Sequence, residues 1–201
     1  MIDTIIFDFA GVVTKENFRP VLIRKCKEKF GLDEAEFRQH FSDAETSFLL
    51  GEMSLKDFWQ IACKGYEVPF EQFAEVFVSA YEINPDMVSL IEKLKKNYHV
   101  VMLSDNFDRL SENIKNNPIL KPLFERFFLS NEMHLAKKTP GCFEHVLKEL
   151  GKKPDECVFT DDKKENIEPA LMLGIHSLHF TGLEKFKSDL VALGVIIVGN
   201  S

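Results

Sequence analysis

The chain has 201 residues, of which 45% are hydrophobic and 28% are charged. This composition is typical of a globular protein and excludes a disordered, collagen-like or coiled-coil chain, while the length allows one sizeable core plus a lobe. The 32 acidic residues outnumber the 25 basic ones, which gives a net charge of −7. The chain therefore lacks the broad basic surface that neutralises a phosphate backbone, and we expect no nucleic-acid partner.

The cysteines and the N-terminus indicate the compartment. The four cysteines are far apart and form no Cys-x-x-Cys pair, so we expect reduced thiols and no zinc site or dense disulfide framework. The N-terminus carries Asp3 where a signal peptide would carry basic residues, and no apolar run approaches the roughly 18 residues that a membrane span needs. We expect a cytoplasmic protein with no membrane segment.

The N-terminal part of the chain predicts one buried strand followed by helices. Thr4 to Phe9 is an apolar run broken only by Asp8, which stands where the strand ends. From Thr14 to about Asn84 the apolar residues recur at helical spacing, without the alternation of a half-buried strand. Ser54, three residues before Asp57, is an expected helix N-cap. We therefore expect several helices and no sheet in this stretch.

The remainder alternates helices and strands. The expected elements are a helix from Asn84-Pro85 to about Asn97, a strand over Tyr98 to Leu103, a helix to about Asn116, a strand over Phe127 to Leu129, a helix capped by Thr139-Pro140 and stopped by Gly151, a strand over Cys157 to Thr160, a helix that Pro169 forces to begin near Asn166, and a strand over Ile175 to Phe180. This order predicts an α/β fold, a doubly wound parallel sheet with an inserted all-helical segment.

Polar residues stand at the carboxyl ends of these strands, where doubly wound sheets bind ligands. They are Asp8, Ser104, Asp161 and Asp162. A single carboxylate at a strand end is as readily a turn residue. Three acids at one sheet edge, however, repel one another unless a cation lies among them, and an all-oxygen set suits Mg²⁺, which usually meets its substrate through phosphate. Lysines at 137 and 138, ahead of a helix N-terminus, would hold the remaining phosphate charge.

In this order, the motifs resemble those of the haloacid dehalogenase superfamily and cover the whole chain. The first is Ile-Ile-Phe-Asp8-Phe-Ala10-Gly11-Val-Val-Thr14, the second Val-Met-Leu-Ser104-Asp105-Asn106, the third Lys137 in Ala-Lys-Lys-Thr-Pro, and the fourth Val-Phe-Thr-Asp161-Asp162 followed by Asn166-Ile167. Each motif alone is weak evidence, whereas the ordered set is specific.

The resemblance implies a domain division, a site and a reaction. It implies a Rossmann-like catalytic core of residues 1–14 and 85–201, with a helical cap over residues 15–84. The implied catalytic residues are Asp8 as nucleophile, Ser104 and Lys137; the substrate-binding ones are Ser104, Asp105, Asn106 and Lys137; and the Mg²⁺ ligands are Asp8, the Ala10 carbonyl, Asp161 and Asp162. The substrate implied is a small phosphorylated metabolite, cleaved through an aspartyl phosphate by a monomer or homodimer.

Three positions depart from the family pattern. The family usually follows its lysine with proline, and here Lys138-Thr139 intervenes; the spacing from Ser130 favours Lys137 over Lys138. Ala10 stands where family phosphatases usually carry a second aspartate, the general acid, although some sugar-phosphate phosphatases have glycine there. This alanine is either natural or an engineered replacement, and it predicts slow hydrolysis of poor leaving groups. Asp105 replaces a more common asparagine and would weaken phosphate binding unless it pairs with Arg109 or the metal.

Two alternatives to a phosphatase remain. A 2-haloacid dehalogenase also uses the aspartate nucleophile and lacks the second aspartate, but it needs no metal, which the Asp161-Asp162 pair argues against. A non-catalytic protein that keeps the fold for binding is the other alternative, in which Ala10 and Asp105 have eroded the chemistry. Retention of Asp8, Ser104, Lys137 and Asp162 argues against it.

Overall fold

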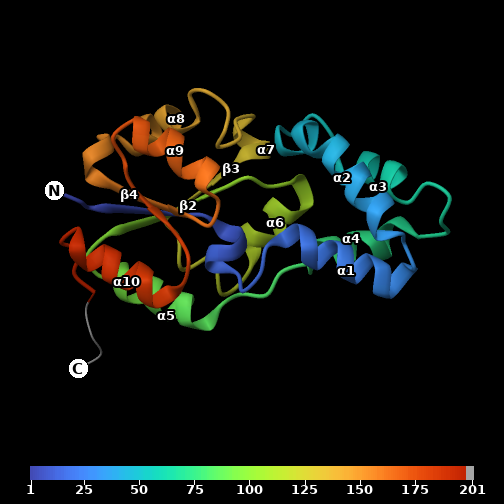
Figure 1. Ribbon diagram of the computed structural model, residues 1–201, viewed down its shortest axis with the longest axis horizontal. Coiled ribbons are helices and arrows are strands. Elements are labelled where there is room, and N and C mark those ends of the chain that lie inside the picture. The colour runs from blue at the N-terminus through green and yellow to red at the C-terminus, as the bar shows by residue number, and fades with distance from the viewer. Residues whose placement is uncertain (198–201) are drawn as a thin grey trace.

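The computed structural model describes residues 1–197 and has a five-stranded parallel sheet at its centre (Figure 1). The strands are β1 (Thr4–Phe7), β2 (His99–Ser104), β3 (Arg126–Leu129), β4 (Cys157–Asp161) and β5 (His176–His179). Their order across the sheet is β3-β2-β1-β4-β5, so β1 is the central strand between β2 and β4. The expected doubly wound α/β fold is confirmed.

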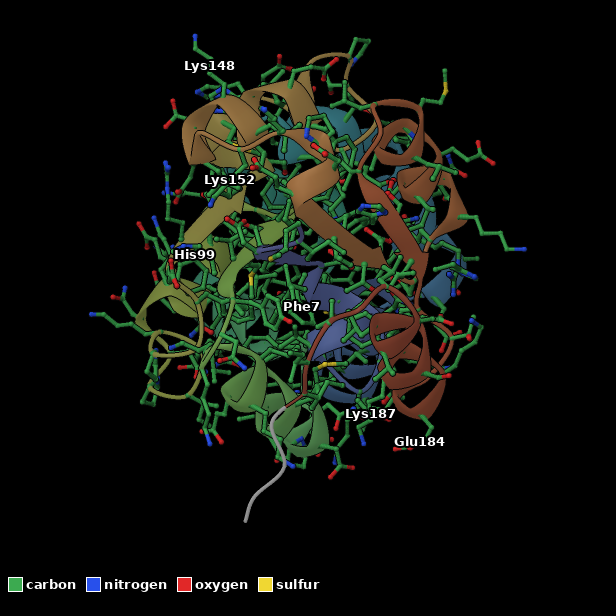
Figure 2. All side chains as sticks on the ribbon, turned by 90° about the vertical axis from the view of Figure 1, so that its left-hand side faces the viewer. Phe7, His99, Lys148, Lys152, Glu184 and Lys187 are labelled. Carbon is green, nitrogen blue, oxygen red and sulfur yellow. The ribbon has the colours of Figure 1, made fainter. Side chains whose placement is uncertain are left out.

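Helices cover both faces of this sheet because its inner strands are apolar on both sides. One face carries α5 (Pro85–Leu94), α6 (Asp108–Asn116) and α10 (Leu183–Ala192), and the other carries α8 (Cys142–Leu150) and α9 (Lys164–Met172). Along β1, Ile5 and Phe7 belong to the first hydrophobic cluster and Ile6 to the second, as strand alternation requires. Figure 2 shows Phe7 in the middle of the packed side chains, with Lys148 and Glu184 at the periphery.

Between β1 and α5 the chain forms helices that lie together at one end of the molecule (Figure 1). They are α1 (Phe18–Phe30), α2 (Glu34–Leu49), α3 (Leu55–Ala62) and α4 (Phe70–Val78). Ser54 caps α3 in a reciprocal capping box with Asp57, as expected. Phe107, which follows β2, packs into the aromatic cluster of these helices with its ring centroid 4.5 Å from that of Phe48. Because this cluster continues into the sheet's core, the division into a core and a cap stays a prediction.

Several predicted boundaries are wrong, each for a local reason. The first strand ends at Phe7 rather than Phe9 because the chain enters a short helical turn over Phe9–Val13. Helix α9 begins at Lys164 and keeps Pro169 inside it, at the cost of one backbone hydrogen bond. Thr139 does not cap α8, which begins at Cys142; its hydroxyl instead accepts a hydrogen bond from the Ala136 amide.

Five further features differ from or complete the sequence-based expectation. The helix expected to end near Asn97 ends at Leu94, and a short helix, α7 (Ser130–Met133), follows β3 where none was expected. The insert is not free of sheet pairing, because Thr14 and Ile83 form an isolated antiparallel bridge at its two ends. No helix within residues 1–197 is long and apolar enough to cross a membrane. The cysteines, Cys26, Cys63, Cys142 and Cys157, are all buried and free.

Candidate active site

Strands β1 and β4 end side by side and bring three carboxylates together. Asp8 follows β1, Asp161 is the last residue of β4 and Asp162 comes next. The parallel register aligns Phe7 with Thr160, and the Asp8 amide donates to the Thr160 carbonyl at 2.9 Å. One carboxylate oxygen from each aspartate lies within 4.8 Å of the others. The sheet therefore assembles this carboxylate cluster of Asp8, Asp161 and Asp162 from segments about 150 residues apart.

The ammonium of Lys137 lies between two carboxylates of the cluster. Its Nζ donates to Asp8 Oδ1 and, at 2.6 Å, to Asp161 Oδ2, and its side chain is 1% exposed. The backbone amide of Lys137 donates to Asp105 Oδ1 at 2.8 Å, which fixes the loop that presents the side chain. Lys138 is exposed, with its Nζ 3.5 Å from Glu165 Oε1. The structure thus brings Lys137 into the carboxylate cluster and leaves Lys138 outside it.

The cluster holds more carboxylates than its one buried ammonium can neutralise. Burial raises the pKa of Asp8 from 3.8 to about 7, and the Asp161 carboxylate adds to the rise while the Lys137 ammonium opposes it. Burial would also raise the pKa of Asp161, but Lys137 and the donors of Lys163 and Asn166 hold it below its ordinary value. The two carboxylates keep the pKa of Lys137 above its ordinary value despite burial. One ammonium therefore neutralises one of the two carboxylates that it contacts.

A divalent cation fits this site. Three carboxylates and one ammonium leave two negative charges, which Mg²⁺ would balance. Asp162 Oδ1 is buried and has no hydrogen-bond partner among residues 1–197, while its Oδ2 accepts from Asn17 Nδ2 at 2.7 Å. A buried carboxylate oxygen without a partner is costly unless a cation or water binds it. The residues present and their oxygen donors therefore suit Mg²⁺.

The turn after β1 passes close to Asp162. Within this turn Gly11 has φ +83°, and a Cβ atom built on it would lie 2.7 Å from Asp162 Oδ2. Only glycine satisfies both the backbone conformation and the close approach. Ala10 precedes it and lines the cavity described below. The assignment of the Ala10 carbonyl as a metal ligand stays a prediction.

The residues after β2 lie at the same edge of the sheet. Ser104 is buried, and its hydroxyl makes only a 3.5 Å contact with the Asp105 carbonyl, so the hydroxyl remains able to donate elsewhere. Asp105 pairs neither with Arg109 nor with another cation of the described residues. Its carboxylate accepts the Lys137 amide instead, while Arg109 lies over the Phe70 ring at 5.1 Å. Of the two partners considered for Asp105, Arg109 is therefore not used, and pairing with the metal stays a prediction.

Asparagines complete the polar surroundings. Asn106 accepts from the Phe107 amide through Oδ1, and its Nδ2 is buried without a partner in the described part of the chain. Asn166 Nδ2 donates to Asp161 Oδ2 at 3.0 Å, and Asn17 holds Asp162 as above. Sequence reasoning missed Asn17, because it stands at the N-cap position of α1, where asparagine is common, yet makes no capping bond there.

A cavity of about 730 Å³ opens beside the cluster. The core contributes Ala10, Asp105 and Asn166 to its wall, and the opposite wall comes from α1 and α2. On that wall Arg19 forms an ion pair with Glu45. The cavity is thus bounded on one side by residues adjacent to the carboxylate cluster and on the other by the helical insert.

Comparison with known proteins places this geometry in a family. A family model described as haloacid dehalogenase-like hydrolase matches residues 2–174. The chain is 24% identical over 207 residues to a D-ribitol-5-phosphate phosphatase of Bacteroides thetaiotaomicron, covering 96% of this chain and 98% of that protein. A HAD family enzyme of that organism, solved as a magnesium complex, has a TM-score of 0.75 at 25% identity, over 88% of this chain and 92% of that one.

Another solved structure shows the fold at lower identity. The L-2-haloacid dehalogenase of Xanthobacter autotrophicus has a TM-score of 0.69 at 16% identity, covering 98% of this chain and 85% of that one. The family model spans both the strands that carry the carboxylate cluster and the loop that carries Lys137. The chain therefore belongs to the haloacid dehalogenase-like hydrolases.

Proposed function

We propose that the protein is a Mg²⁺-dependent phosphatase of a small phosphorylated metabolite. The observation that carries this proposal is the carboxylate cluster, in which Asp8 contacts the buried ammonium of Lys137 and Asp162 keeps a buried oxygen without a partner. The related Bacteroides protein is a phosphatase, and a solved HAD family enzyme of that organism binds magnesium and inorganic phosphate. Both comparisons support the same chemistry for this chain.

In the proposed reaction Asp8 is the nucleophile. One of its oxygens attacks the phosphorus atom of the substrate, a bond between that oxygen and phosphorus forms, and the bond to the leaving-group oxygen breaks. Water then attacks the aspartyl phosphate, which releases inorganic phosphate and restores the carboxylate. Lys137 opposes the burial-driven rise in the pKa of Asp8 and would offset the phosphoryl charge, and the Ser104 hydroxyl would donate to a phosphoryl oxygen. Mg²⁺, held by Asp8, Asp162 and the Ala10 carbonyl, would neutralise further charge on the phosphoryl group.

Ala10 limits this reaction. Ala10 lines the cavity and stands at the sequence position where a general acid would protonate the leaving alkoxide. General acid catalysis is typically worth about 10²–10⁴-fold. We therefore expect slow turnover of alkyl phosphates and faster turnover of esters whose leaving group needs no proton.

A panel of phosphorylated metabolites assayed with Mg²⁺ and with EDTA tests the proposal. We expect phosphate release with Mg²⁺ and none with EDTA, and none from the Asp8→Asn variant in either condition. Metal-independent release of halide from L-2-haloacids would instead establish the dehalogenase alternative. Mg²⁺ binding without hydrolysis of any ester would leave the non-catalytic alternative.

A further inference from the structure

The charged side chains that line the cavity are matched in number. The cations that line the cavity are Arg19, Lys138 and Lys163, and the carboxylates are Glu45, Asp105 and Glu165. Arg19 pairs with Glu45, and Lys138 lies 3.5 Å from Glu165. Lys163 has no carboxylate partner for its ammonium within residues 1–197, but its backbone amide donates to Asp161 Oδ1 at 2.8 Å, so it lies on the core side of the cavity, next to the carboxylate cluster. No cation is therefore free on the wall opposite Asp8 to bind a second anionic group.

The Arg19–Glu45 pair keeps hydrogen-bonding capacity after pairing. The two side chains are 32% and 34% exposed, and the pair uses one guanidinium nitrogen and one carboxylate oxygen. The Arg19 guanidinium also lies 4.9 Å from the centroid of the Phe41 ring, which holds it in place on α1 against α2. The remaining guanidinium N–H groups are donors and the second Glu45 oxygen is an acceptor. A hydroxyl group, which donates and accepts, matches both partners at once.

A carboxylate or second phosphate on the substrate would meet this pair differently. It could reach the remaining Arg19 N–H groups only beside Glu45, so two anions would share one guanidinium in a partly buried wall. An apolar leaving group would cover the pair without replacing its hydrogen bonds to water, which is also unfavourable.

We propose that the Arg19–Glu45 pair determines substrate specificity, a proposal that rests on the phosphatase function proposed above. The pair selects phosphate monoesters whose leaving group is uncharged and carries hydroxyl groups. It disfavours esters whose leaving group carries a further anionic group. The pair acts through substrate binding, since it lies on α1 and α2 and makes no contact with Asp8 or Lys137. Its effect should therefore fall on KM more than on kcat.

Glycerol 3-phosphate and 3-phosphoglycerate test the proposal, because they differ mainly in a terminal hydroxymethyl or carboxylate group. We expect the wild type to have the higher kcat/KM for glycerol 3-phosphate. Glu45→Gln, which frees Arg19, should lower kcat/KM for glycerol 3-phosphate about tenfold and raise it for 3-phosphoglycerate about tenfold, as one charge-assisted contact is lost and another gained. Most of each change should lie in KM.

Matched variants separate specificity from structure. Glu45→Asp keeps the charge and should keep the wild-type substrate preference. Glu149→Gln removes the surface partner of Arg126, away from the cavity, and should leave kcat/KM unchanged for both substrates. Arg19→Met should lower kcat/KM for both substrates and never favour 3-phosphoglycerate. If Glu45→Gln fails to fold, the Arg19→Met result decides. The proposal is overturned if Glu45→Gln changes the ratio of the two kcat/KM values less than threefold. It is also overturned if the wild type prefers 3-phosphoglycerate.

Binding measurements distinguish failure of this proposal from failure of the phosphatase function. Isothermal titration of both esters into the inactive Asp8→Asn variant measures binding without turnover. Adding Glu45→Gln to that variant should reverse its preference from glycerol 3-phosphate to 3-phosphoglycerate. If the wild type hydrolyses no ester but the reversal in binding appears, the phosphatase function fails and the role of the pair stands. If hydrolysis occurs and neither kinetics nor binding shows the reversal, the role of the pair fails alone.

Discussion

Replacing Asp8 by Asn is expected to make the metal-free protein more stable while it abolishes hydrolysis. Asp8 is 5% exposed, and burial raises its pKa from 3.8 to about 7 although Lys137 contacts it. A raised pKa means that the fold favours the neutral carboxyl over the ionised one. Asparagine has nearly the same shape as the neutral carboxyl and carries no charge at any pH. The variant therefore avoids the cost of holding an ionised Asp8 in this site.

The magnitude follows from the difference between the two pKa values. Between pH 3.8 and about 7 the folded protein keeps a proton on Asp8 that the unfolded chain has released. Wild-type stability therefore falls as pH rises through this window and levels off above it. At about 1.36 kcal/mol per tenfold change, Asp8→Asn should exceed the wild type in free energy of unfolding by up to about 4 kcal/mol at pH 8 and by about 2 kcal/mol at pH 5.

Urea unfolding in EDTA at these pH values measures the difference. Asp3→Asn is a control of opposite sign, because Lys152 lowers the pKa of Asp3 and the variant should lose stability. Saturating Mg²⁺ should stabilise the wild type through mass action and narrow its gap to Asp8→Asn. An Asp8→Asn protein that is less stable than the wild type at pH 8 in EDTA would refute the reasoning. It would mean that the ion pair with Lys137 outweighs the cost of burial.

The other predictions concern the metal, the missing acid, the turn and the core. Asp162→Asn should abolish Mg²⁺ binding in isothermal titration because it removes the charge of a carboxylate whose buried Oδ1 has no hydrogen-bond partner within residues 1–197, whereas Asp105→Asn should still bind the ion. Ala10→Asp should raise kcat/KM for alkyl phosphates by up to about 10²–10⁴-fold and affect aryl phosphates less; equal responses in steady-state assays would contradict a role in leaving-group protonation. Gly11→Ala should cost about 1–3 kcal/mol in urea unfolding, because alanine is strained at φ +83° and its Cβ meets Asp162; an unchanged midpoint would mean that the turn relaxes. Phe107→Ala should cost about 3–5 kcal/mol, and a loss under 1 kcal/mol would show that its ring packs loosely against the helical insert.

The sequence by itself determined the elements that the chain could form. Apolar runs bounded by polar residues identified the five strands, and Phe spacing together with Ser54 identified the helices of the insert. These signals are local, because periodicity, capping and glycine conformation depend on neighbours within a few residues. Parallel connectivity then required Asp8, Ser104 and Asp161 to stand at one edge of the sheet. Element ends were less well determined, as Pro169 inside α9 shows.

The tertiary structure alone decided how the side chains at that edge are paired. Two adjacent lysines at 137 and 138 are alike in sequence, and only the loop held by Asp105 places Lys137 between Asp8 and Asp161. Asn17 reaches Asp162 across 145 positions of sequence, and Arg19 meets Glu45 across two helices. Such pairings depend on the packing of distant segments, for which residue type and local spacing carry no signal. Burial of the carboxylate cluster, and hence the pKa of Asp8, arises only after that packing is complete.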